Sequence, residues 1–273
     1  NLSSQDQRLG LFTAFNHAQI KELINNFNPD LWWFDGDWEQ SAEKWKAREI
    51  RGMILEASPD AIINSRLQGY GDYATPEQGL PASRPAERYW ELCMTINDSW
   101  GYQQNDRNFK TPGQIIWIFA ECISKGGNLL LDIGPKADGT IPDEEVTVLK
   151  ALGKWTSKHS EAIYGTSAGL PAGYFHGPST ISRDSTMLYL FVSGDPRGQV
   201  MLEGVRNKIN RIYVVGNGTK LTWKEYLKPY WSTNAGLLFI DVPEAVLDEH
   251  LTVLAVALDG KLRRIGAPAV LAS

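Results

Sequence analysis

The sequence predicts an α/β domain followed by an antiparallel β-sandwich. Over residues 17–165, segments with helical spacing of apolar residues alternate with short apolar runs, as is typical of a parallel sheet or a (β/α) barrel. After about Gly169 the pattern changes to short strand-like segments separated by Gly, Asn and Asp turns. The run Gly-Leu-Pro-Ala-Gly at 169–173 is typical of a linker. We therefore expect one domain at 1–168 and a second at 169–273.

Four helices are expected in the α/β domain. Pro29 ends the first, because proline cannot continue a helix, and Ser41 can cap the second. Pro112 stands in the first turn of the third. Pro142 begins the fourth, whose first turn is acidic and so matches the helix dipole. The helices are expected at 17–27, 41–57, 111–124 and 142–159.

Short apolar runs between these helices predict strands. The run at 31–35 does not alternate, which indicates a strand buried on both faces, and 61–64 resembles it. Residues 67–88 lack periodicity and are rich in Gly, Pro, Tyr and Asp, so we expect a long loop, which in a compact domain is often functional. The strands of the α/β domain are expected at 31–35, 61–64, 90–96 and 128–133. Those of the sandwich are expected at 187–192, 199–202, 212–215, 237–242 and 251–257.

The number of strand–helix units does not match a closed barrel. The α/β part supplies about four units, whereas a closed barrel needs eight. The pattern therefore predicts either an open sheet or the C-terminal half of a barrel.

Composition excludes several classes of function. The net charge is −5, which favours neither nucleic acid nor an anionic membrane as a partner. No run approaches the roughly 18 apolar residues of a membrane span. Cys93 and Cys122 form no disulfide framework and no zinc spacing, so we expect two buried thiols. Ten Trp and ten Tyr could stack on sugar rings, although core packing accounts for most of them.

Asp35 is the first candidate for catalysis. It ends the predicted strand at 31–35, and the carboxyl ends of strands are where α/β folds bind ligands. There it could act as a nucleophile or a general base, the alternative being a simple Asp-Gly turn. Trp33 lies one pleat away on the same face, where its ring would form the wall of a pocket.

Glu91 and Arg66 complete the candidate set. Glu91 follows Trp90 at the start of an apolar strand, so its pKa should be raised, as a general acid requires. The alternative is a carboxylate on the rim of the site, paired to Arg84 or Arg88. Arg66 ends the second strand and could bind a substrate hydroxyl, hold a carboxylate ionised or form a structural ion pair. Two carboxylates near aromatic rings fit glycoside hydrolysis.

Four motifs resemble the α-L-fucosidases of glycoside hydrolase family 29. They are Leu-Trp-Trp-Phe-Asp-Gly at 31–36, Ile-Asn-Ser-Arg at 63–66, Trp-Glu-Leu-Cys-Met-Thr-Ile-Asn-Asp-Ser-Trp-Gly-Tyr at 90–102, and Gly-Gly-Asn-Leu-Leu-Leu-Asp-Ile-Gly-Pro-Lys-Ala-Asp-Gly at 126–139. The resemblance covers about residues 15–165. It implies the C-terminal half of a (β/α)8-like catalytic barrel followed by a β-sandwich.

The resemblance also implies a retaining hydrolase that releases α-L-fucose. We expect no metal and no cofactor, since two-carboxylate glycosidases need none. Asp35 falls on the family's nucleophile, and Glu91 on the acid/base of several members. Trp33 falls on a tryptophan that contacts fucose, and Arg66 on an arginine that binds the sugar.

Two aromatic residues of the third motif are weaker candidates. Trp100 and Tyr102 could line the sugar pocket, or they could simply pack in the core.

Family members place a half-barrel before the nucleophile strand. An open half-barrel would expose a large apolar edge, so we expect the N-terminal half to be present as a separate polypeptide or a further segment. The alternatives are an inactive sugar-binding fragment or another retaining barrel glycosidase. We expect a secreted, periplasmic or lysosomal protein, although no signal peptide is visible.

Overall fold

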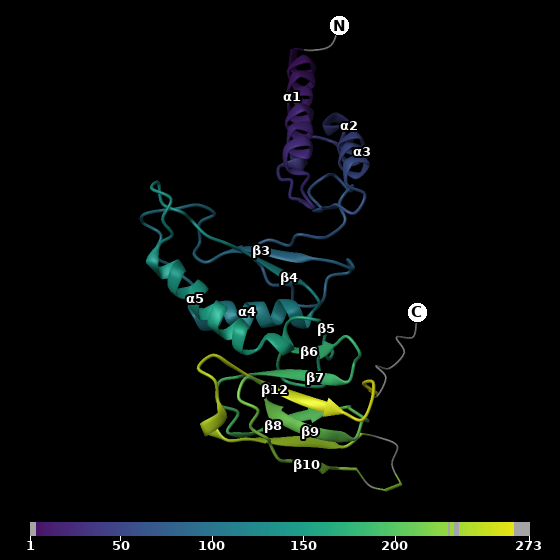
Figure 1. The fold of residues 1–273 in the computed structure, drawn as a ribbon, viewed down its shortest axis with the longest axis vertical. Helices are drawn as coiled ribbons and strands as arrows, with labels where there is room; N and C mark the ends of the chain where they lie inside the picture. The colour runs from purple at the N-terminus through teal and green to yellow at the C-terminus, as the bar shows by residue number, and fades with distance from the viewer. Residues whose placement is uncertain (1–3, 229, 232–234, 265–273) are drawn as a thin grey trace. The chain divides into compact units, whose positions relative to one another are not determined.

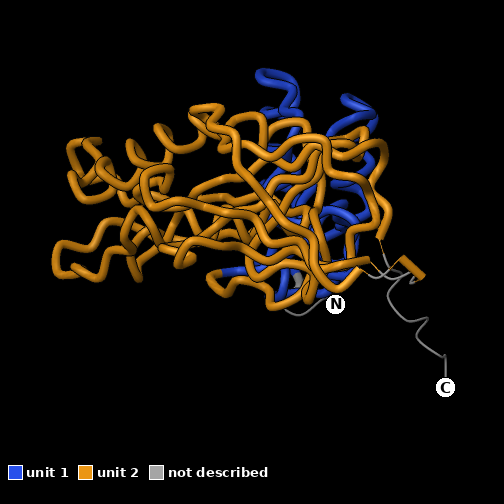
Figure 2. The backbone as a smooth tube through the Cα atoms, turned by 90° about the horizontal axis from the view of Figure 1, so that it is seen from below, with its two compact units in different colours: residues 1–77, 85–91 blue, residues 78–84, 92–273 orange. Residues whose placement is uncertain are grey.

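The computed structural model describes residues 4–228, 230–231 and 235–264 (Figure 1). The chain forms two compact units, coloured separately in Figure 2. The first comprises residues 1–77 and 85–91, and the second comprises 78–84 and 92–273. The domains expected at 1–168 and 169–273 were defined by sequence pattern rather than by contacts, and they stay a prediction.

The described part of the first unit contains three α-helices, α1 (Ser4–Phe27), α2 (Ala42–Trp45) and α3 (Ala47–Ala57). The helix predicted at 17–27 is shorter than α1. Several apolar side chains before residue 17 are exposed, so this part of the helix lacks the single buried stripe by which a helix is predicted. Ser41 caps α2 as predicted, accepting a hydrogen bond from the Lys44 N–H at 3.4 Å. The prediction of a single helix at 41–57 was wrong. Lys46 adopts a left-handed conformation (φ 53°) and separates α2 from α3.

The first unit contains one short parallel strand pair, β1 (Leu31–Trp32) with β2 (Ile62–Ile63). Trp32 and Ile63 are buried, but Leu31 and Ile62 are 45% and 46% exposed. The prediction that both strands are buried on two faces was therefore wrong, because only one face of the pair packs on a core. That core consists of Ile20, Trp32, Ala47, Ile50, Ile54, Ala61, Ile63 and Leu67.

The expected loop at 67–88 contains neither a helix nor a named strand. It is held by isolated parallel bridges, Asn64 with Tyr73 and Ala74 with Trp90. The Ala74 N–H donates to the Tyr89 carbonyl at 3.0 Å, and the Glu91 N–H donates to the Ala74 carbonyl at 2.9 Å. These bonds place residues 75–77 next to the start of the following strand.

The second unit begins its α/β part with two strands and two helices. Strand β3 (Glu91–Thr95), whose first residue belongs to the first unit, pairs with β4 (Asn128–Asp132). Helices α4 (Pro112–Ser124) and α5 (Asp143–Lys158) match the predicted ranges closely. Thr111 forms a capping box with Gln114, in which each side chain bonds the other's backbone N–H.

The rest of the second unit, where the structure describes it, contains two antiparallel sheets (Figure 1). The larger has the strand order β5-β6-β7-β12-β9, and the smaller β10-β11-β8. Their bounds are β5 Thr166–Ala168, β6 Ser179–Ser182, β7 Met187–Ser193, β8 Gly198–Glu203, β9 Ile209–Val214, β10 Trp223–Tyr226, β11 Leu237–Val242 and β12 Leu251–Leu258. Strands β5, β6 and β10 were not predicted, because their sequences are short and largely polar.

The larger sheet is covered on both faces. Leu190 of β7 and Leu254 of β12 share a core with Leu202 of β8 and Ile240 of β11, so the two sheets pack face to face. Phe191 and Val253 point the other way and pack with helices α4 and α5. An antiparallel sandwich, as predicted, therefore forms this part of the unit. Among the described residues, no helix has the length and apolar character needed to cross a membrane.

Replacing Thr111 by alanine should lower the free energy of unfolding by about 1 kcal/mol, because the Gln114 N–H loses its cap. Urea denaturation measures the change. Thr111→Ser is the matched control, since it keeps the hydroxyl and should stay close to wild type. Equal losses in both variants would contradict the capping role.

Candidate active site

Asp35 lies just beyond the end of β1, at the turn formed by Gly36. Its side chain is 58% exposed. The preceding residue, Phe34, is clamped by the side-chain amide of Asn64, which accepts from the Phe34 N–H at 2.9 Å and donates to the Phe34 carbonyl at 2.8 Å. Asn64 is fully buried. Its amide therefore replaces the backbone hydrogen bonds that a longer β2 would make to Phe34. This fixes the direction in which the chain leaves β1 at Asp35.

Arg66 follows β2 and holds two carboxylates at once. One terminal nitrogen donates to Asp35 Oδ1 at 2.7 Å and the other to Glu77 Oε2 at 2.7 Å. Its Nε donates to Thr75 Oγ1 at 3.2 Å. Burial alone would lower the pKa of Arg66, but the bonds and charges of Asp35 and Glu77 raise it overall. Arg66 is thus a permanent cation with a fixed orientation.

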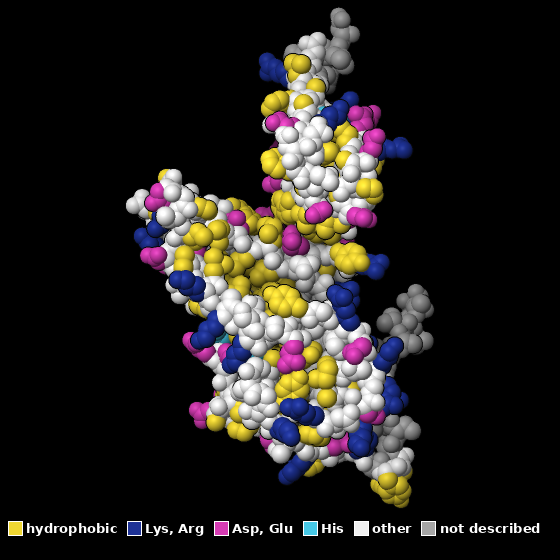
Figure 3. Space-filling model, viewed as in Figure 1, with side chains coloured by type: hydrophobic (Ala, Val, Ile, Leu, Met, Phe, Trp, Pro, Cys, Tyr) yellow, Lys and Arg dark blue, Asp and Glu magenta, His cyan; other side chains and the backbone are white. Residues whose placement is uncertain are grey.

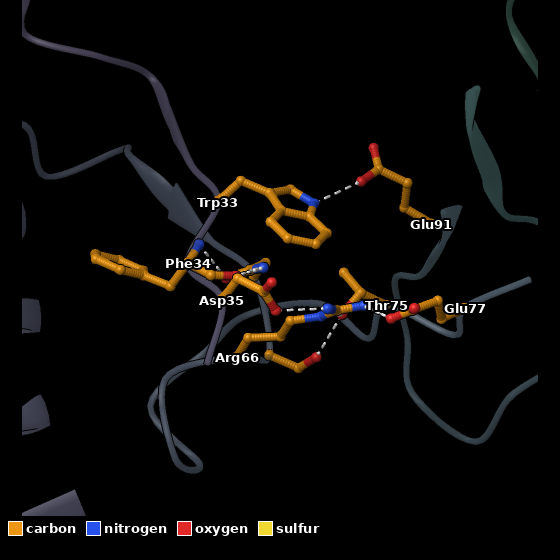
Figure 4. A network of polar contacts seen from close by, with 9 residues as sticks. Trp33, Phe34, Asp35, Arg66, Thr75, Glu77 and Glu91 are labelled. Carbon is orange, nitrogen blue, oxygen red and sulfur yellow. Dashed lines mark hydrogen bonds and ion pairs between the residues drawn. The ribbon is translucent and has the colours of Figure 1, made fainter. Parts of the chain in front are cut away.

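Trp33 connects this cation to Glu91. The Arg66 guanidinium lies over the Trp33 ring, 4.5 Å from its centroid, in a cation–π contact. On the other side, Trp33 Nε1 donates to Glu91 Oε1 at 3.3 Å. Figure 4 shows the resulting chain of contacts from Glu91 through Trp33 to Arg66, with Asp35 and Glu77 at its end.

Glu91 is half-buried at the start of β3. Burial raises the pKa of its carboxyl group, and the Trp33 hydrogen bond offsets this only in part. The direction agrees with the sequence-based expectation. Of the two arginines considered as partners, Arg88 instead stacks on Tyr89, 5.0 Å from its ring centroid. Glu91 is therefore a carboxyl group that takes up a proton more readily than an ordinary glutamate.

The network brings together four of the six predicted site residues: Trp33, Asp35, Arg66 and Glu91. Sequence reasoning missed three others: Asn64, Thr75 and Glu77. The signal for Glu77 was its place in the long loop after Arg66, but an aperiodic loop does not reveal which of its acids turns toward the site.

Trp100 and Tyr102 belong to the second unit, and each is 43% exposed. Neither ring is part of a buried core, so the packing alternative does not describe them. Tyr102 lines a cavity of about 240 Å³ together with Asn97, Phe109 and Lys136. Their part in sugar binding stays a prediction.

The two thiols are buried, as expected. Burial raises the pKa of Cys122 to about 12, so it is no nucleophile. In the part of the chain that the structure describes, no three His, Cys, Asp or Glu side chains are grouped to hold a metal ion. The chemical groups that the network brings together are carboxylates, a guanidinium and an indole ring.

Comparison with known proteins identifies the family. The sequence profile of the α-L-fucosidases matches residues 1–161. The chain belongs to the α-L-fucosidase family. Its resemblance in the four motifs is thus confirmed over the part that contains Trp33, Asp35, Arg66 and Glu91.

Individual relatives agree with this assignment. An α-L-fucosidase of Dictyostelium discoideum is 33% identical over 160 residues, which cover 55% of this chain and 34% of that protein. The human tissue α-L-fucosidase is 29% identical over 226 residues, covering 77% of this chain and 48% of that protein. The solved structure of α-L-fucosidase isoenzyme 1 from Paenibacillus thiaminolyticus superimposes with a TM-score of 0.82 at 32% identity, covering 92% of this chain and 63% of that one. The chain thus spans about a third to a half of these curated relatives.

Asn64→Ala should destabilise the protein by about 1–3 kcal/mol, because it leaves the Phe34 N–H and carbonyl without partners. Amide hydrogen exchange at Phe34 should accelerate in parallel. Asn26→Ala, on the exposed surface of α1, is the control and should have little effect on either. Unchanged exchange at Phe34 would show that the clamp is not needed.

Proposed function

We propose that the protein forms part of a retaining α-L-fucosidase in which Asp35 is the nucleophile and Glu91 the acid/base. The observation that carries this proposal is the network itself. One guanidinium forms an ion pair with Asp35 at 2.7 Å, while a carboxyl group with a raised pKa is joined to the same cation through an indole. Two carboxyl groups in such different environments suit opposite roles.

In the first step, an Asp35 oxygen attacks the anomeric carbon of an α-L-fucosyl unit and forms a covalent ester. The bond to the leaving oxygen breaks as Glu91 donates its proton to that oxygen. In the second step, Glu91 accepts a proton from water, the water oxygen bonds to the anomeric carbon, and the ester bond to Asp35 breaks. Fucose leaves with its configuration retained, and both carboxyl groups return to their starting states.

Glu77 is the competing candidate for proton transfer. It is already ion-paired to Arg66 at 2.7 Å, whereas Glu91 bonds only to an indole N–H. We therefore assign proton transfer to Glu91, and to Glu77 the orientation of Arg66. In this assignment Arg66 and Trp33 also contact the sugar, and Trp100 and Tyr102 line the pocket.

The active enzyme requires the rest of the barrel. The chain covers 34% of the Dictyostelium relative and 63% of the Paenibacillus structure. The first unit also exposes many large apolar side chains, some visible on α1 in Figure 3, and such patches usually mark an interaction surface. They include Leu11, Phe12, Phe15, Leu23, Phe27, Leu31 and Ile62. We propose that the N-terminal half-barrel, as a separate polypeptide or a further segment, packs against them.

Two alternatives make different predictions. An inactive sugar-binding fragment would bind fucose without releasing it from an aryl α-L-fucoside, even with the barrel complete. Another retaining barrel glycosidase would cleave a different member of an aryl glycoside panel. A secreted, periplasmic or lysosomal location stays a prediction.

Asp35→Gly should lower turnover of an aryl α-L-fucoside by more than about 10³-fold in the assembled barrel, because no covalent ester can form. Added azide should restore cleavage by attacking the anomeric carbon in place of Asp35. Asp37→Asn is a control in the adjacent turn, where the side chain accepts from the Gln68 N–H. Near-full activity of Asp35→Gly without azide would reject the nucleophile.

The pH profile tests Glu91. The first step needs Glu91 in its protonated form, so kcat/KM should fall as the pH rises through the pKa of Glu91. Because burial raises this pKa, the fall should come at a higher pH than for an exposed glutamate. Glu91→Gln should remove this alkaline limb of the pH profile. It should also lower kcat/KM on an unactivated fucoside by about 10²–10⁴-fold.

Glu77→Gln is the matched comparison and should keep the limb. If the limb disappears in Glu77→Gln and persists in Glu91→Gln, the proton-transfer role belongs to Glu77 instead.

A further inference from the structure

A polar groove lies in the sandwich. It contains none of the residues to which we assign a part in hydrolysis. Its volume is about 340 Å³, within the range of small-ligand sites. Leu202 of β8 and Leu238 of β11 contribute from the smaller sheet, and Ile209 of β9 from the larger. The groove therefore opens at an edge of the sandwich where the two sheets approach each other.

The groove carries an excess of positive charge. Four cations line it, Arg206, Lys208, Lys228 and Arg263, against the carboxylates of Glu225 and Asp259.

The two carboxylates are already paired. Arg263 binds both oxygens of Asp259 at 2.8 and 2.9 Å, and Lys228 binds Glu225 at 2.8 Å. Arg206 and Lys208 are exposed, and their side chains form no ion pair or hydrogen bond with any part of the chain that the structure describes. Two cations in one groove that have no partner among the described residues are notable on a chain of net charge −5.

The turn at 206–208, which carries these two cations, is held in place by a buried side chain. Asn207, between them, is only 5% exposed. Its side-chain amide donates to Asp259 Oδ1 at 2.8 Å and to the Lys261 carbonyl at 3.1 Å, and its Oδ1 accepts from the Arg263 N–H at 2.6 Å. One buried side chain thus ties the turn at 206–208 to the segment at 259–263. The backbone positions of the cations are set before any ligand arrives, which lowers the entropic cost of binding.

One aromatic ring borders the same groove. Trp223 lies in its lining and is half-buried. Exposed aromatic rings present flat apolar faces with a polar edge, which suits the C–H faces of sugar rings.

We propose that this groove binds an anionic glycan, in which a sulfate or carboxylate group pairs with Arg206 and Lys208 and a sugar ring stacks on Trp223. A neutral sugar would leave the two cations unused. A nucleic acid backbone would extend beyond the groove over a chain with excess negative charge. Sulfated and carboxylated sugars share the required chemistry.

Isothermal titration of the whole chain tests the proposal with three trisaccharides: one sulfated, one built of uronic acids and one neutral. At least one of the anionic trisaccharides should bind, and added salt should weaken it. The neutral one should bind at least about ten-fold more weakly. Whichever anionic trisaccharide binds more tightly identifies the anion.

The double variant Arg206→Ala/Lys208→Ala should weaken anionic binding by about ten-fold or more with an unchanged melting temperature. Lys224→Ala is the matched control, a lysine on β10 that does not line the groove, and should bind like wild type. The proposal is overturned if neither anionic trisaccharide binds, if the double variant binds like wild type, or if the neutral sugar or a single-stranded oligonucleotide binds equally well. Because none of these readouts involves fucose release, they are independent of the proposed hydrolysis.

Discussion

The arrangement of the candidate site depends on the guanidinium of Arg66. Its three nitrogens bond Asp35, Glu77 and Thr75, and its face lies on the ring of Trp33. Trp33 in turn bonds Glu91. Because a guanidinium is planar and always charged, it fixes the geometry around Asp35. Both carboxyl groups of the proposed mechanism are thus connected through one cation, directly for Asp35 and through an indole for Glu91.

The backbone that supports this cation is short. The parallel pair β1–β2 is only two residues long, and the buried amide of Asn64 extends it to Phe34. The bonds of Ala74 to residues 89 and 91 bring the loop after Arg66 to the start of β3. Three segments that are distant in sequence are joined in this way by a few backbone and amide hydrogen bonds. Small changes at Asn64 should therefore reach the site.

The sequence was most informative where the signal is local. Asp35 and Arg66 follow short apolar runs, and Glu91 begins another, so the alternation of helix and strand placed them at strand ends. Their assembly into one network agrees with that expectation, while their catalytic roles stay predictions. Glu77 and Thr75 were missed because contacts of an aperiodic loop are set by tertiary structure. The left-handed Lys46 that separates α2 from α3 had no sequence signal, and Leu31 is exposed because its burial depends on neighbours that periodicity does not specify.

The most direct test of the central claim is to trap the covalent intermediate. The assembled barrel is incubated with a 2-deoxy-2-fluoro-α-L-fucosyl fluoride, whose fluorine slows hydrolysis of the ester, and intact mass and peptide mass spectra are recorded. The account predicts one fluorofucosyl adduct on the peptide that contains Asp35, and no adduct in Asp35→Ala. An adduct on Glu77 or Glu91 instead, or continued turnover of the wild type with no adduct, would contradict it.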